Sequence, residues 1–144
     1  AAAADIAAKE MDDESRRISG YRDRLIEGVL GAIPKSRLNG HPAERLPNNA
    51  HFRFEAIEGE SLLLSIKDLG IAASTGSACS SKTLEPSHTL LSCGLLHEEA
   101  HGSLEFTFGR FSKEADVGRV LEVLPGVVGR LRGISPLYEK EAKA

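Results

Sequence analysis

The chain has 144 residues, a formal net charge of −3 and 41% hydrophobic residues. This length is typical of one domain, and the weak negative charge gives no basic field of the kind that attracts phosphate backbones, which argues against nucleic acid as a partner. No apolar run approaches the roughly 20 residues of a membrane span, and two cysteines are too few for a disulfide framework, which favours a reducing, cytoplasmic setting without membrane contact.

Helical periodicity is found at both ends of the chain. Residues 4–33 place apolar side chains on one helical face, and Pro34 closes this helix. A last helix from Ser112 groups its apolar residues in the same way, and we expect Pro125 to bend or interrupt it. These two amphipathic helices are long enough to cover a small sheet.

The middle of the chain mixes short strands with short helices. Alternation of apolar and polar residues predicts strands at 50–56 and 104–108, and the turn-rich residues 37–49 leave room for at most one more. Short helices are expected at 62–69 and 86–94, and "IAAS", residues 71–74, reads as a short strand. The order predicts an α+β two-layer sandwich: a small, mostly antiparallel sheet covered by long amphipathic helices, with residues 1–144 as a single domain.

A metal site is one interpretation of the histidine-rich region. "HEEAH", residues 97–101, matches the H-E-x-x-H pattern of zinc proteases. Glycines bracket it within two helical turns and no third ligand follows at the expected spacing, which argues against a protease. A wider set of possible ligands lacks the paired spacing of a structural zinc site: Cys79, His88, Cys93, His97 and His101. We expect Cys93 to be a small buried residue.

The stretch "STGSACSS", residues 74–81, holds the other cysteine among residues too small to bury a sulfur atom. An exposed thiol on such a loop suits a nucleophile, and backbone N–H groups, Lys82 or a nearby histidine would favour its thiolate. The alternative is a small buried residue or an unreactive free thiol. The candidate site is therefore Cys79 with its mobile-loop neighbours Thr75, Gly76, Ser77, Ala78, Ser80 and Ser81.

Longer stretches carry a family resemblance. They are "EGESLLLSIKDLGIAASTGSACSSKTLEPSHTLLSCGL", "AHGSLEFTFGRF" and "VVGRLRGISPLY". Together they resemble the C-terminal part of NifS/IscS-type cysteine desulfurases, in the fold-type I, aminotransferase class V group of pyridoxal phosphate enzymes. The likeness covers nearly the whole chain, and G-S-A-C-[ST]-S followed by L-E-P-S-H is its most specific motif.

The resemblance implies the small C-terminal domain of an enzyme that converts L-cysteine to L-alanine and leaves a persulfide on Cys79. The sulfur would serve iron–sulfur cluster assembly or thiolation, and Cys79 would also be a transient ligand of a nascent cluster. Nothing in this sequence matches the His-Lys sequence that carries the Schiff-base lysine of the family. Pyridoxal 5'-phosphate would therefore be bound by a preceding large domain, in cis or in trans. We expect the isolated chain to be inactive. The implied partners are an iron–sulfur scaffold protein or another sulfur acceptor, and a second copy in a homodimer.

One departure from the family pattern concerns substrate binding. The family's S-I-R-F-S-L-G-R reads "SLEFTFGR" here, with Glu105 in the place of the arginine that holds the substrate carboxylate. Because a glutamate repels a carboxylate, either another group holds the substrate or catalysis is weakened. The alternative function is a non-catalytic persulfide relay or scaffold-docking module without its own cofactor site, and a redox-active thiol domain is a third.

Overall fold

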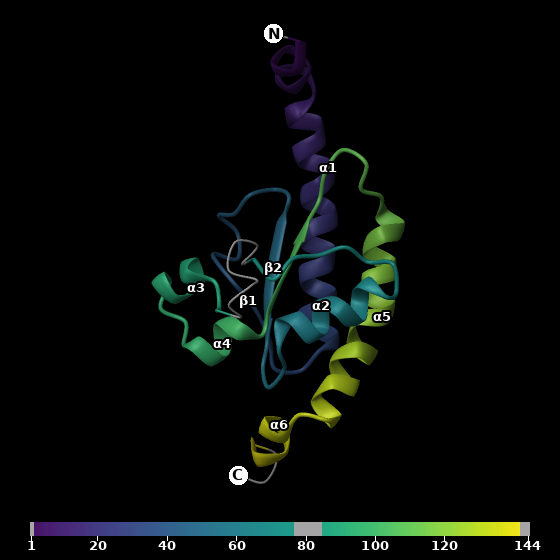
Figure 1. Cartoon of the computed structure of the whole chain (residues 1–144). Coiled ribbons are helices and arrows are strands. Elements are labelled where there is room, and N and C mark those ends of the chain that lie inside the picture. The colour runs from purple at the N-terminus through teal and green to yellow at the C-terminus, as the bar shows by residue number, and fades with distance from the viewer. Residues whose placement is uncertain (1, 77–84, 142–144) are drawn as a thin grey trace.

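Six helices and three strands are found in the computed structural model, which describes residues 2–76 and 85–141 (Figure 1). In chain order they are α1 (Ala2–Ala32), β1 (Ser36–Leu38), β2 (Asn49–Phe54), α2 (Gly59–Lys67), α3 (His88–Ser92), α4 (His97–His101), β3 (Ser103–Thr107), α5 (Glu114–Gly133) and α6 (Pro136–Glu141). The long first and last amphipathic helices and the strands around residues 50–56 and 104–108 are thereby confirmed.

The three strands form one antiparallel sheet in the order β1-β2-β3. Phe52 lies opposite Leu38 on one side and Leu104 on the other, and Ala50 lies opposite Phe106. Side chains alternate between the two faces of a strand, so β2 buries Ala50, Phe52 and Phe54 on one face only.

Helices α1, α2 and α5 cover that apolar face and close the core. Leu25 of α1, Leu62 of α2 and Leu124 of α5 are at most 1% exposed, like the strand residues beneath them. The predicted α+β sandwich with a small antiparallel sheet is confirmed. The polar face of the sheet carries Asn49, His51 and Arg53 from β2 and Glu105 from β3, and it is this face that positions the candidate site.

Two local predictions need correction. Residues 71–74 form no strand: only Ser74 bridges to Glu105, and the chain turns away two residues later at Gly76, whose φ is +73°. Of the two effects expected of Pro125, a bend or an interruption, the interruption does not occur, because α5 is continuous from residue 114 to residue 133. The apolar contacts of Leu124, Val127 and Val128 with the core offset the hydrogen bond that the proline removes.

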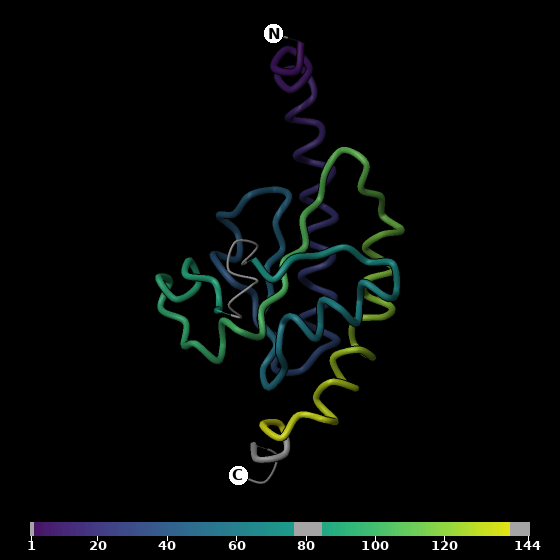
Figure 2. The backbone as a smooth tube through the Cα atoms, viewed as in Figure 1, coloured from purple at the N-terminus to yellow at the C-terminus, as the bar shows by residue number. Residues whose placement is uncertain are grey.

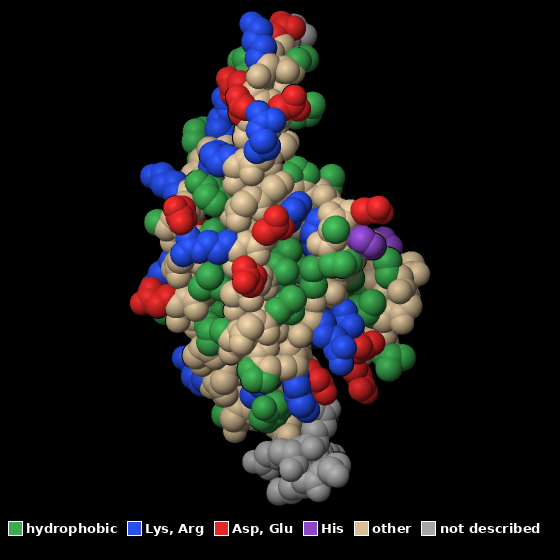
Figure 3. Space-filling model, turned by 180° about the vertical axis from the view of Figure 1, so that it is seen from behind, with side chains coloured by type: hydrophobic (Ala, Val, Ile, Leu, Met, Phe, Trp, Pro, Cys, Tyr) green, Lys and Arg blue, Asp and Glu red, His purple; other side chains and the backbone are tan. Residues whose placement is uncertain are grey.

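Helix α1 projects beyond the sheet at its N-terminal end (Figure 1). The Arg17 guanidinium holds the connection between β3 and α5 to this helix by donating to the carbonyl oxygens of Gly109, Arg110 and Ser112. From behind, acidic and basic side chains are mixed along the projection (Figure 3). No helix within residues 2–76 and 85–141 has the length and apolar character to cross a bilayer.

Candidate functional site

The cysteine-bearing loop starts from a fixed point on the sheet. Ser74 donates its backbone N–H to the Glu105 carbonyl oxygen at 3.0 Å and accepts the Glu105 N–H at 2.6 Å. The Ser74 hydroxyl then accepts the N–H of Gly76 at 3.0 Å. Figure 2 shows this segment, residues 71–76, returning to the sheet beside β3. The root of the loop is therefore anchored to the free edge of β3, at the middle of that strand.

The far end of the loop is anchored as well. Pro86 and Ser87 are buried, and the Ser87 carbonyl oxygen accepts the Leu91 N–H at 3.1 Å in the first turn of α3. Of the predicted site residues, Thr75 is half-buried and Gly76 is exposed. The others lie outside the described residues: Ser77, Ala78, Cys79, Ser80 and Ser81.

Beside the root of the loop lies a polar cluster that spans β2 and β3. His51 lies directly opposite Glu105 in the sheet register. The Asn49 side-chain amide donates to Glu105 Oε1, and Arg45 Nη2 donates to Asn49 Oδ1 at 3.3 Å. A second bond from Arg45, Nε to the Asn49 carbonyl oxygen at 3.1 Å, fixes the guanidinium. The Glu105 carboxylate is thus connected to Arg45 through one amide.

The His51 imidazole is held against the loop root. Its Nε2 atom is buried and has no hydrogen-bond partner among the described residues. A methyl group built on Gly76 would lie 3.3 Å from His51 Cε1 and 3.6 Å from Nε2, so this ring edge faces the glycine. Burial lowers the pKa of His51. The Glu105 carboxylate acts in the opposite direction and Arg45 lowers the pKa further, so the net shift is downward. The ring is therefore neutral at neutral pH.

The histidine-rich region does not assemble a metal centre within the described residues. His97 and His101 lie one turn apart on the five-residue helix α4, with ring centroids 5.6 Å apart. No group of three or more potential metal ligands occurs in the described parts of the chain. The prediction that Cys93 is buried was wrong: it ends the short surface helix α3 and its free thiol is exposed.

Comparison with known proteins gives the family. The profile of the family "Aminotransferase class-V" matches residues 1–120. The chain belongs to this family. The cysteine desulfurase IscS 1 of Archaeoglobus fulgidus is 60% identical over 138 residues, and the cysteine desulfurase IscS of Methanosarcina thermophila is 55% identical over 139 residues. Each match covers 96% of this chain, so the resemblance of this class-V chain to cysteine desulfurases is confirmed.

The class-V chain spans about a third of the length of these relatives, 36% of the first and 34% of the second. Solved structures show the same proportion. A NifS-like protein superposes with a TM-score of 0.74 at 20% identity, over 88% of this chain and 31% of its own. A NifS-like protein from Rickettsia africae gives 0.73 at 18% identity, over 86% of this chain and 31% of its own. These two likenesses show a shared fold.

The class-V family is dependent on pyridoxal phosphate. A lysine must reach its aldehyde from a desolvated position. The lysines whose burial is described are all exposed: Lys9, Lys35, Lys67 and Lys113. The described part of this class-V chain therefore does not fit the cofactor.

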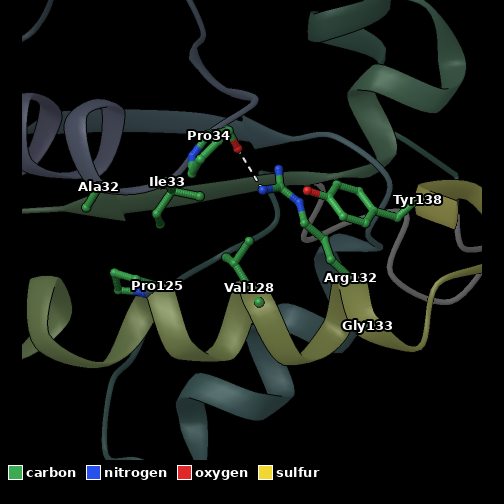
Figure 4. A pocket seen from close by; sticks show the side chains of 9 residues that line it. Ala32, Ile33, Pro34, Pro125, Val128, Arg132, Gly133 and Tyr138 are labelled. Carbon is green, nitrogen blue, oxygen red and sulfur yellow. Dashed lines mark hydrogen bonds between the residues drawn. The ribbon is translucent and has the colours of Figure 1, made fainter. Parts of the chain in front are cut away.

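A groove of about 300 Å³ lies between the C-terminal end of α1, α5 and α6 (Figure 4). Its walls are mostly apolar, with Ile33, Pro125 and Val128 among them. The guanidinium of Arg132 stands at one end but is already bonded to the carbonyl oxygens of Pro34, Lys35 and Glu55. The Arg132 guanidinium therefore joins α5 to the segments that follow α1 and β2, and it is not placed to receive a phosphate.

Sequence reasoning missed His51, Asn49 and Arg45 as neighbours of the loop. The alternation at residues 50–56 did place His51 on the polar face of a strand. Two further features depend on long-range pairing: the register that sets His51 opposite Glu105, and the turn that brings Gly76 against His51. The local sequence pattern gives no signal for either.

Proposed function

We propose that this chain is the small domain of a cysteine desulfurase and that Cys79 is its sulfur-accepting residue. The observation that carries the proposal is the match of 96% of the chain to relatives that bear this name, at 60% and 55% identity. The loop that holds Cys79 falls inside the residues that the family profile matches. Because the residues next to Cys79 in the sequence are small and hydroxyl-bearing, we expect its sulfur to be accessible to a substrate and then to an acceptor.

In the proposed reaction one sulfur atom moves from L-cysteine to the Cys79 thiol. The Cys79 thiolate attacks the substrate sulfur, an S–S bond forms, and the bond from that sulfur to the β-carbon breaks. The electron pair stays with the carbon skeleton, which takes up protons and leaves as L-alanine, so L-cysteine and a thiol give L-alanine and a persulfide with no other oxidant. Pyridoxal phosphate, bound by a domain outside these residues, supplies the electron-accepting chemistry.

The described residues contribute by anchoring the loop. Ser74 is bonded to β3 through Glu105 on one side, and buried Pro86 and Ser87 hold the chain on the other. A thiol tethered between two fixed points samples a limited volume, which raises its effective concentration near a substrate and an acceptor.

The partners and location follow from the same proposal. The persulfide passes to an iron–sulfur scaffold protein or another thiol acceptor, and Cys79 is a transient ligand of a nascent iron–sulfur cluster. The complete enzyme is a cytoplasmic homodimer, in which this single domain works with a cofactor-binding domain in the same or another polypeptide. The isolated chain is inactive because none of its described lysines is desolvated.

A second candidate function is a persulfide relay that carries sulfur on Cys79 without turning over L-cysteine. The specific observation in its favour is Glu105, a carboxylate on the polar face beside the loop root. A negative charge at this position disfavours an amino-acid carboxylate unless another group compensates.

The test is the intact mass of the chain after incubation with L-cysteine and pyridoxal phosphate, alone and as the complemented enzyme, meaning this chain joined to a cofactor-binding domain of its family. We expect a gain of one sulfur atom, with release of L-alanine, in the complemented enzyme alone. Uptake from a persulfide donor but never from L-cysteine would favour the relay.

Two serine variants locate the acceptor. Cys79→Ser should abolish sulfur uptake. Cys93→Ser is the matched control, because Cys93 is an exposed free thiol outside the loop, and it should leave uptake unchanged. Sulfur acceptance that survives Cys79→Ser would refute the assignment of Cys79 and favour an unspecific redox thiol.

A further inference from the structure

The face of α1 that packs on the core continues along the part of the helix that projects beyond it (Figure 1). This face is buried from Ile18 onward. Helical spacings of three, four and seven residues place three earlier side chains on the same face: Ala4, Ala7 and Met11. Residues 2–13 are all exposed, and Met11 is 61% exposed. The apolar stripe of α1 is therefore longer than the described core that covers it.

A large apolar side chain is exposed in the connection between β3 and α5. Phe111 is 88% exposed. The turn that carries it is closed twice, because Gly109 donates its N–H to Ser112 Oγ and Ser112 donates its N–H to the Gly109 carbonyl oxygen, both at 3.0 Å. The backbone around Phe111 is thus held in place, and its ring is presented to the outside instead of packing into the core.

Ion pairs join this connection to the projecting part of α1. Arg110 pairs with Glu10 and, at 3.9 Å from Nε to Oε2, with Glu14. Glu10 directly precedes Met11, and Phe111 directly follows Arg110, so the two apolar side chains lie at the same end of the molecule. We name this surface the α1 apex and define it by four residues: Ala4, Ala7, Met11 and Phe111. Because the turn and the ion pairs already order it, a partner would bind it at a reduced entropic cost.

The extent of the family match indicates what kind of partner covers the α1 apex. The family profile matches residues 1–120, so the whole apex belongs to the matched region and is not an unrelated extension. The chain spans only 36% and 34% of the two cysteine desulfurase relatives. Exposed apolar patches of this kind mark interaction sites. The remaining two thirds of such an enzyme offers a surface that this chain by itself lacks.

A second copy of this chain fits the α1 apex less well. Residues 5–16 carry five acidic and two basic side chains. Two such helices side by side would bring like charges together, which opposes their pairing. Two alanines and one methionine also supply little of the roughly 800 Å² that each partner buries in a stable interface. The charge and the size of the stripe therefore favour a different partner.

We propose that the α1 apex docks onto the cofactor-binding domain of the complete enzyme, with Met11 and Phe111 against an apolar surface of that domain. This inference rests on the proposed function, since it takes from there that the chain works with such a domain. Ala4 and Ala7 allow that domain to approach the helix backbone closely. The acidic side chains around the stripe call for neutral or basic residues at the rim of the contact.

The test uses Met11, the single methionine of this chain, as a probe of coverage. Hydrogen peroxide oxidises an accessible methionine to its sulfoxide, which adds one oxygen atom. The rate is followed by mass spectrometry of the peptide that contains Met11, in the isolated chain and in the complemented enzyme. Met11 should be oxidised about tenfold more slowly in the complemented enzyme. In the isolated chain the rate should not depend on protein concentration.

Two alanine variants of the complemented enzyme test the role of Phe111. Phe111→Ala should speed the oxidation of Met11 about threefold or more, because the loss of a large aromatic side chain loosens the contact. Ile134→Ala is the matched control, since Ile134 is 77% exposed and follows the other end of α5, and it should leave the rate unchanged. Equal oxidation of Met11 in the isolated chain and the complemented enzyme, or an unchanged rate in Phe111→Ala, would overturn the inference. A rate that falls with the concentration of the isolated chain would overturn it in favour of a second copy.

These outcomes separate the inference from the proposed function, because the oxidation of Met11 is measured without L-cysteine. Protection of Met11 in the complemented enzyme supports the docking surface even when L-cysteine yields no L-alanine, in which case only the proposed reaction fails. Formation of L-alanine by a complemented enzyme whose Met11 stays fully accessible refutes the docking surface and leaves the function standing.

Discussion

Ser74 and Glu105 exchange both of their backbone hydrogen bonds, at 3.0 and 2.6 Å, although a helix pair and the whole cysteine-bearing loop separate them in the chain. This bridge ties the loop root to β3 without forming a further strand. It also brings Gly76 against His51, so the loop, the imidazole and the carboxylate meet at one place on the sheet.

The bridge should control how well Cys79 reaches the substrate. Ser74→Pro removes the N–H that Glu105 accepts, and we expect persulfide formation in the complemented enzyme to fall about tenfold, because small misplacements of a reacting group are costly. Ser74→Ala keeps the backbone bonds and loses only the hydroxyl that Gly76 uses, so it should lose less than about threefold. Intact-mass time courses measure both, and equal rates for all three proteins would contradict the role of the bridge.

Residue 102, which directly precedes β3, should not tolerate a side chain. A Cβ on Gly102 would lie 2.4 Å from the Phe54 carbonyl oxygen and 2.9 Å from that of Ile57, and both contacts are with backbone. Gly102→Ala should therefore lower the free energy of unfolding by about 1–3 kcal/mol or more. Gly118→Ala has nothing within 4 Å and lies in helix α5, so urea denaturation should show it about 0.5–1 kcal/mol more stable.

The guanidinium of Arg132 should be irreplaceable by an ammonium group. It is 5% exposed and donates to three carbonyl oxygens, those of Pro34, Lys35 and Glu55. Lysine lacks the planar fork, so Arg132→Lys should destabilise the chain by about 1–3 kcal/mol. Arg130→Lys, an exposed change on the same helix, should stay within about 0.5 kcal/mol. A similar small effect for both variants would show that the three bonds contribute little.

Stability should depend on pH through His51. Burial lowers the pKa of this group in the folded chain, so the unfolded chain binds more protons between the folded pKa and about 6.5. The free energy of unfolding therefore falls as the pH drops through this window and is unaffected above it. His51→Phe should flatten this part of the profile, measured by urea denaturation from about pH 7.5 to 5. An identical profile in the variant would contradict a buried neutral imidazole.

Local sequence patterns predicted the parts of the fold that depend on short-range periodicity. The apolar spacing of α1 and α5 and the alternation at β2 and β3 are set by which residues must be buried together, and each was confirmed. Where the outcome depended on more distant groups, prediction failed: residues 71–74 make a single bridge, and Cys93 is exposed because its helix has only five residues and lies at the surface. At Pro125, where a bend or an interruption was expected, the structure excludes the interruption.

For the candidate site, the sequence by itself determined the family and the loop, because a motif of small residues around Cys79 is written in consecutive positions. Only the tertiary structure decided what surrounds the root of that loop. Antiparallel register places residue 51 opposite residue 105, and the positive φ of Gly76 turns the chain against the imidazole. Both depend on hydrogen bonds between segments far apart in the chain, so neither leaves a periodic signal in the sequence.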